Sequence, residues 1–206
     1  MTQLSLMQIL IESETELLVE LRMGNGLDKE QYGKFINAFT ELAGLWEKEN
    51  SLPNKAVQSI MEIYAELCQF SFNYSDEESK RIRDAAQQIN ILREQCLSGS
   101  GKPDHNQAET IRGLIQYIDE NNGFFVQMEQ GKGMDEEQFE RIFQELEKVF
   151  SEITSWQAIP KSVVKILIAF YEMDLLVIKY EEEFEMQEEA DKIYDAYERV
   201  FELIAG

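Results

Sequence analysis

Apolar side chains recur along this chain mainly at helical spacing. Between residues 28 and 49 they are separated by three or four positions, which places them on one face of a helix: Tyr32, Phe35, Ile36, Phe39, Leu42, Ala43 and Trp46. Similar patterns, interrupted by glycine, proline and capping residues, predict about eight helices. They cover about residues 2–23, 28–49, 53–73, 76–97, 107–130, 135–155, 160–180 and 183–205. The pattern predicts an all-α protein.

The chain also repeats itself at an offset of about 107 residues. The segment 24–32 recurs as the segment 131–139, with five of the nine positions identical. The same offset aligns Pro53 with Pro160. Self-similarity at a fixed offset indicates duplication of a structural unit. We therefore expect a tandem duplication of a four-helix unit, with a first repeat at 1–97, a linker at 98–106 and a second, more acidic repeat at 107–206.

Helix boundaries in both halves carry local signals. Gly24 and Gly26 suit the left-handed conformation that ends a helix, and Asp28 can then cap the next one. Gln31 completes a capping box, which Asp135 and Gln138 repeat. Two prolines, Pro53 and Pro160, suit the first turn of the third helix of each repeat.

Two places in the second half depart from the first. The triplet Asn121-Asn122-Gly123 predicts either a kink or a helix that starts near Phe124. The junction between the last two helices lacks a capping serine. From its residues alone it could continue as one long helix, but the repeat predicts a break near residues 179–183.

The charge of the chain limits its partners. Its 206 residues include 40 acidic and 19 basic side chains, a formal net charge of −21. Such a chain repels phosphate backbones, so we expect no direct binding to nucleic acid. Charged residues interrupt the most apolar stretch, 163–180, which therefore predicts a buried helix and no membrane span. Cys68 and Cys96 align with aliphatic residues of the other half, which favours free thiols and a cytoplasmic location.

Side chains for catalysis or metal binding do not cluster in the sequence. The single histidine, His105, falls in the predicted linker, and no Cys/His group has the spacing of a zinc site. The segment from Gly99 to Lys102 resembles part of a phosphate-binding loop, but Cys96 stands where that motif requires glycine. The sequence therefore predicts no enzyme activity, no cofactor and no metal site.

The remaining signal is an excess of carboxylates near the C-terminus. Residues 104–206 carry 24 acidic and 9 basic side chains, compared with 16 and 10 in residues 1–103. Like charges on one helix face destabilise it slightly, so keeping them in one repeat favours a role in binding a basic partner. The candidate partner-binding residues are Glu181, Glu182, Glu183, Glu185, Glu188, Glu189, Asp191, Asp195 and Trp156. One alternative is a solvated face without a role, and the alternative for Trp156 is that it caps the bottom of the second bundle.

These observations favour a non-catalytic, acidic protein-binding module that neutralises a basic protein partner. Toxin-neutralising immunity proteins and nucleic-acid-mimicking inhibitors act in this way, and the analogy rests on size, charge and helicity. One alternative is a structural or scaffold protein that self-associates as a homo-oligomer, with charge serving solubility. Another is a helical bundle that binds a small ligand or a metal through buried carboxylates.

Overall fold

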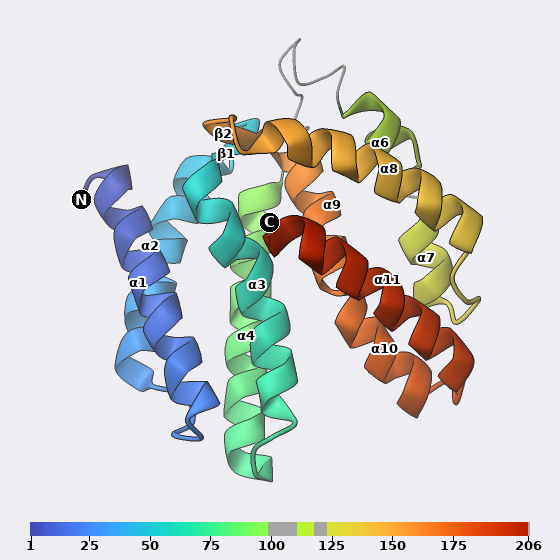
Figure 1. Ribbon diagram of the computed structural model, residues 1–206. Coiled ribbons are helices and arrows are strands. Elements are labelled where there is room, and N and C mark those ends of the chain that lie inside the picture. Colours follow the sequence, from blue (N-terminus) through green and yellow to red (C-terminus); the bar gives the residue numbers. More distant parts are fainter. Residues whose placement is uncertain (99–110, 118–122, 206) are drawn as a thin grey trace. The chain divides into compact units, whose positions relative to one another are not determined.

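The computed structural model describes residues 1–98, 111–117 and 123–205, and these are mostly helical (Figure 1). The all-α prediction is therefore confirmed. The predicted linker beyond residue 98, with His105, and the pair Asn121-Asn122 lie outside the described residues. The elements in chain order are α1 (Gln3–Arg22), α2 (Lys29–Trp46), β1 (Ser51–Pro53), α3 (Asn54–Ser71), α4 (Asp76–Leu97), α6 (Arg112–Tyr117), α7 (Phe124–Glu129), α8 (Glu136–Ile153), β2 (Ala158–Pro160), α9 (Lys161–Tyr171), α10 (Met173–Glu182) and α11 (Gln187–Ala205).

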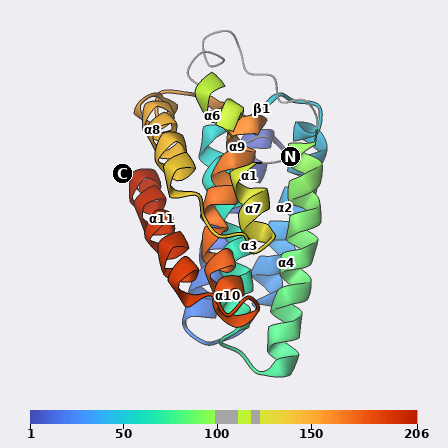
Figure 2. The same cartoon turned by 90° about the vertical axis from the view of Figure 1, so that its right-hand side faces the viewer.

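The chain divides into two compact units. The first contains Met1–Gly101 together with Ala158–Lys161, and the second contains Lys102–Gln157 and Ser162–Gly206. In the first unit α1 packs on α2 and α3, and α4 packs on the same two helices, which makes a four-helix bundle (Figures 1 and 2). The core of this bundle is apolar and fully buried, and includes Leu10, Leu17, Phe39, Trp46, Ile60, Ile63, Leu67, Ile82 and Ile89.

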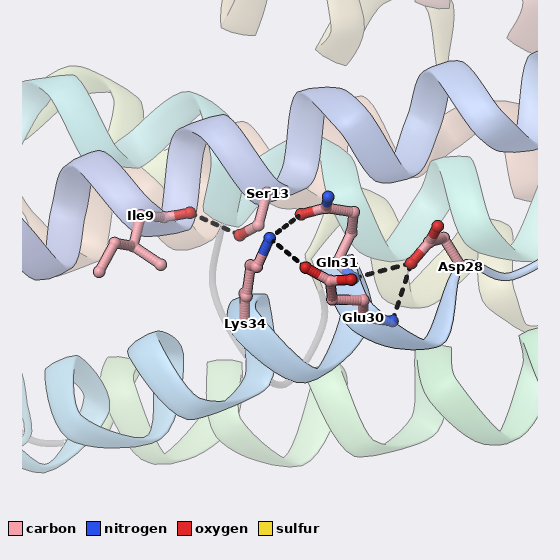
Figure 3. Close-up of polar contacts among 6 residues, drawn as sticks. All are labelled: Ile9, Ser13, Asp28, Glu30, Gln31 and Lys34. Carbon is pink, nitrogen blue, oxygen red and sulfur yellow. Dashed lines mark hydrogen bonds and ion pairs between the residues drawn. The ribbon is translucent and has the colours of Figure 1, made fainter.

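Side-chain caps start α2 and α8, as the sequence predicts. The Asp28 carboxylate accepts hydrogen bonds from the backbone N–H groups of Glu30 and Gln31, at 2.8 and 2.9 Å (Figure 3). Lys34, one turn later, contacts the side chains of Glu30 and Gln31. Asp135 caps α8 by accepting from the N–H of Gln138 at 2.9 Å. Each cap satisfies an N–H group that has no partner within its helix.

A short antiparallel pairing of β1 with β2 was not predicted. Its register pairs Ser51 with Pro160, Leu52 with Ile159 and Pro53 with Ala158. Strands of three residues are too short to show a period of two, so the hydrophobic pattern gave no signal for them. Both prolines consequently precede their helices directly, and the prediction that placed them inside the first helical turn is wrong by one residue.

Aromatic contacts join the helices α7, α8 and α9 of the second unit to one another. Phe124 of α7 stacks on Phe139 of α8, with ring centroids 6.1 Å apart. Phe125 meets Phe170 of α9 edge to face at 4.8 Å. Further along the chain, α11 packs on α10 and α8. These contacts bury the apolar faces of α7, α8 and α9 together.

Helix boundaries in the second unit correct two predictions. The start of α7 at Phe124 agrees with one of the two predicted outcomes of the Asn-Asn-Gly triplet. The expected helix 160–180 is instead divided at Glu172 into α9 and α10. The break before the last helix covers 183–186, later than the predicted 179–183, and α11 starts at Gln187. A continuous helical pattern in the sequence gave no sign of either position.

One carboxyl group is buried in the first unit. Glu14 of α1 is only 6% exposed, although exposed residues flank it at 15 and 16. Burial, opposed by a hydrogen bond from Ser59 and reinforced by the carboxylates of Glu62 and Glu66, raises the pKa of Glu14 to about 7. Because this pKa lies above that of the unfolded chain, the group favours folding most at low pH, and that contribution is lost as the pH rises from about 4.5 through 7.

The substitution Glu14→Gln removes this titration while keeping the shape of the side chain. We expect the variant to match the wild type near pH 5 and to be more stable at pH 8, by on the order of 2–3 kcal/mol. Urea unfolding at both pH values measures the difference. The matched control is Glu16→Gln, at an exposed position of the same helix, which we expect to be neutral. An equal difference at pH 5 and pH 8 would contradict the account.

Candidate interaction site

The predicted partner-binding residues fall on three elements. Glu181 and Glu182 end α10, Glu183 and Glu185 lie in the turn 183–186, and the remaining four acidic residues lie on α11. Glu181 and Glu185 do not lie on one continuous helix with Glu188 and Glu189, because α10 ends at Glu182 and Glu185 has a φ of +55°. Trp156 lies elsewhere, between α8 and β2, and is half-buried.

A buried tyrosine attaches this segment to the turn between α7 and α8. The Tyr180 hydroxyl donates to the carbonyl of Met128 and accepts from the N–H of Gly133, both at 2.9 Å. Its side chain is fully buried, and this burial raises the pKa of Tyr180. The ring of Tyr180 meets Phe184 edge to face at 5.1 Å. Tyr180 therefore joins the end of α10 to the preceding glycine turn.

Phe184 covers the other glycine of that turn. A Cβ atom on Gly131 would lie 3.1 Å from the Phe184 ring, so a larger residue there would require the ring to shift. The Lys179 ammonium lies 5.1 Å from the centre of the same ring and donates to the carbonyl of Glu129 at 3.0 Å. The one apolar residue within the run of acidic residues 181–185 thus anchors that run.

Glu189 differs from the other acidic residues because it is bound within the unit. Its carboxylate accepts from the N–H of Met134 at 3.1 Å and forms an ion pair with Lys192 at 2.7 Å. The hydrogen bond from Lys192, and then that from Met134, lower the pKa of Glu189. Lys192 also pairs with Glu136 at 3.4 Å. Glu189 therefore positions α11 on the start of α8.

We call the remaining seven carboxylates the acidic segment: Glu181, Glu182, Glu183, Glu185, Glu188, Asp191 and Asp195. All seven are exposed. Gln187 donates its amide N–H groups to Glu181 and Asp191, both at 3.0 Å. Within the described parts of the chain, no lysine or arginine forms an ion pair with any of the seven. Lys179 and Lys192 are turned to other partners, so the negative charge is exposed to solvent.

The first unit contains the same attachment. The Tyr74 hydroxyl donates to the Leu21 carbonyl at 2.6 Å and accepts from the N–H of Gly26 at 3.2 Å. Glu78 accepts from the N–H of Leu27 at 2.7 Å, as Glu189 does from Met134. This pair of tyrosines was not predicted, although Tyr74 and Tyr180 are separated by nearly the repeat offset.

The charges around the two attachments differ. When the sequences of α4 and α11 are aligned so that Glu78 matches Glu189, Lys80 matches Asp191 and Arg83 matches Tyr194. Basic side chains thus accompany this attachment in the first unit. In the second unit, acidic and aromatic side chains stand at the same places.

Two further buried groups are structural. The Lys161 ammonium is fully buried and donates to the carbonyls of Glu47 and Ser98, at 3.1 and 2.8 Å. Glu47 and Ser98 are the C-cap residues of α2 and α4, so the ammonium lies at two C-terminal helix ends, where cations are stabilised. Burial raises the pKa of the Cys96 thiol to about 12, which leaves it a poor nucleophile at neutral pH.

Neither metal chemistry nor similarity to known proteins assigns a function. In the described ranges, no group of three or more His, Cys, Asp and Glu side chains is arranged to hold a metal ion. No helix there combines the length and apolar composition that crossing a membrane requires. Comparison with models of protein families, with curated proteins and with solved structures gave no match.

The attachment predicts unequal effects of two glycine substitutions. Gly133 has a φ of +81°, and an added Cβ would lie 2.7 Å from the Glu189 carboxylate. We expect Gly133→Ala to destabilise the protein by about 1–2 kcal/mol in chemical unfolding. The control Gly44→Ala lies within α2 with open space around the added Cβ, and should stabilise it by roughly 0.5–1 kcal/mol. Equal effects of the two substitutions would contradict the strained turn.

Proposed function

We propose that this protein is a non-catalytic, acidic protein-binding module that binds and neutralises a basic protein partner through its second unit. The acidic segment carries the proposal. It presents seven carboxylates on a turn and helix that are anchored by Tyr180, Phe184 and Glu189. Such a surface attracts a basic protein over a distance and speeds its association.

The anchoring favours binding over a purely solvating role. Carboxylates that only keep a protein soluble have no need of a fixed arrangement. Here the segment is connected to the turn between α7 and α8 by the buried Tyr180, by the half-buried Phe184 and by hydrogen bonds from backbone N–H groups. Holding the charges in place before binding reduces the entropy lost when a partner is bound.

We further propose that the two units arose by tandem duplication. The bounds of α2 and α8 differ by 107 residues at both ends, as do those of β1 and β2. The glycines at 24, 26, 131 and 133 all have positive φ. Cys68 and Cys96 are not joined in a disulfide, which supports a reducing compartment such as the cytoplasm. In this proposal the first repeat supplies stability, and the second acquired the binding charge.

The test compares two variants of equal charge. In one, Glu181, Glu182, Glu185 and Glu188 are changed to Gln. In the control, four exposed carboxylates of the first unit are changed to Gln: Glu16, Glu41, Glu49 and Glu77. Wild-type protein first captures its partner from a lysate of the native host with elution by salt steps, and association rates of the purified pair are then measured at low salt.

We expect a basic partner that is released by moderate salt. The first variant should associate at least about tenfold more slowly, because charge at an interface acts mainly on the association rate. The control should remain within about twofold of wild type. Equal losses in both variants would show that only net charge matters, and no loss in either would reject the acidic segment as the binding surface.

A further inference from the structure

One short pattern occurs on two helices of the second unit. Residues 139–143 of α8 read Phe-Glu-Arg-Ile-Phe, and residues 197–201 of α11 read Tyr-Glu-Arg-Val-Phe. In both, two aromatic residues are four positions apart and a glutamate follows the first of them. Residues four apart on a helix are neighbours, so each pattern builds a ring pair with a carboxylate beside it.

The pattern on α8 is filled by an arginine of the same chain. The Arg199 guanidinium lies 4.4 Å from the centre of the Phe143 ring and 5.1 Å from that of Phe139. It also donates two hydrogen bonds to Glu140, one of them at 3.0 Å. The two rings are 5.8 Å apart with an angle of 38° between their planes. This part of the protein shows how a ring pair and a carboxylate hold a guanidinium.

The pattern on α11 has nearly the same ring geometry. Its rings, Tyr197 and Phe201, are 5.9 Å apart with an interplanar angle of 33°. Phe201 is 42% exposed and Glu198 is exposed, so both can be reached from solvent. Glu198 accepts the Tyr194 hydroxyl at 2.8 Å. Over the described residues, no arginine or lysine is recorded against Glu198 or over the Phe201 ring.

We propose that the face formed by Glu198 and Phe201 binds an arginine side chain of the basic partner. The inference rests on the proposed function for the existence of that partner, and adds where and how it is recognised. The guanidinium would lie against the Phe201 ring and donate to Glu198, as Arg199 does at Phe143 and Glu140. Asp191, Asp195 and Glu202 are exposed on the same helix and add negative charge.

Arginine is favoured over lysine for a physical reason. A planar guanidinium stacks on an aromatic face and donates two parallel hydrogen bonds to a carboxylate at the same time. An ammonium group is a more strongly hydrated point charge and makes fewer such contacts. The acidic segment attracts either cation, whereas the face on α11 distinguishes between them.

This face is specific to the second unit. When Glu78 is superimposed on Glu189, the positions of Tyr197, Glu198 and Phe201 are occupied in α4 by Ala86, Gln87 and Asn90. Those residues offer neither a ring nor a carboxylate. The arginine-binding pattern thus occurs in the same unit as the acidic segment.

The test uses two synthetic probes and three variants. The probes are alanine-rich helical peptides that carry either arginine or lysine at every fourth position, and binding is measured by fluorescence anisotropy at low salt. Phe201→Leu removes the ring but keeps an apolar side chain, and Glu198→Gln removes the charge. The matched control is Tyr194→Phe, which removes only the hydroxyl that binds Glu198. Circular dichroism verifies the helical content of each variant.

We expect wild-type protein and Tyr194→Phe to bind the arginine peptide about fivefold more tightly than the lysine peptide, which corresponds to ~1 kcal/mol. Phe201→Leu and Glu198→Gln should each reduce the ratio of the two affinities, arginine peptide over lysine peptide, toward one. Changing Glu181, Glu182, Glu185 and Glu188 to Gln should weaken the binding of both peptides by the same factor. The preference for the arginine peptide should remain.

The outcomes separate this inference from the proposed function. Equal binding of both peptides by wild type, or a preference that survives Phe201→Leu, would overturn the inference alone. Failure of wild type to bind either peptide would overturn both. A wild-type dimer in sedimentation that Phe201→Leu converts to a monomer would assign the face to a second copy of the chain, and would also overturn the inference.

Discussion

A tyrosine hydroxyl that joins the end of one helix to a neighbouring glycine turn is the contact on which the second unit depends. Tyr180 binds the carbonyl of Met128, which also accepts from the N–H of Gly131, and it satisfies the N–H of Gly133 in the turn between α7 and α8. Its full burial means that water cannot replace either bond. Because Tyr180 lies two residues before the end of α10, this contact fixes the place where the turn 183–186 begins.

The exposed charge depends on that buried contact. Carboxylates of like sign repel one another, by ~1 kcal/mol for a pair 4 Å apart in water, and a loose turn would let them separate. Phe184 prevents this by covering Gly131, and Glu189 fixes the first turns of α11 by accepting the N–H of Met134. The acidic segment is therefore held together by aromatic burial and backbone hydrogen bonds, which offset its own repulsion.

Much of the fold was predictable because its signals are local. The glycine turns and the caps at Asp28 and Asp135 depend on residues within a few positions of each other, and they lie where the sequence indicates. The site was less predictable. Nothing local distinguishes Tyr180, whose partners are 47 and 52 residues away, or predicts a positive φ at Glu185, which is not a glycine. The carboxylates could be named from composition, but their division between α10, the turn and α11 required the three-dimensional structure.

The most direct test of the account is amide hydrogen exchange in wild type, Tyr180→Phe and Tyr194→Phe. Tyr180→Phe removes both hydrogen bonds but keeps the ring, and we expect exchange at Gly133, Phe184 and Met186 to rise roughly tenfold, since a lost buried hydrogen bond is worth about 1 kcal/mol. Tyr194→Phe, at an exposed hydroxyl, should leave these amides unchanged. Unaltered protection at all three amides in Tyr180→Phe would contradict the claim that this tyrosine positions the acidic segment.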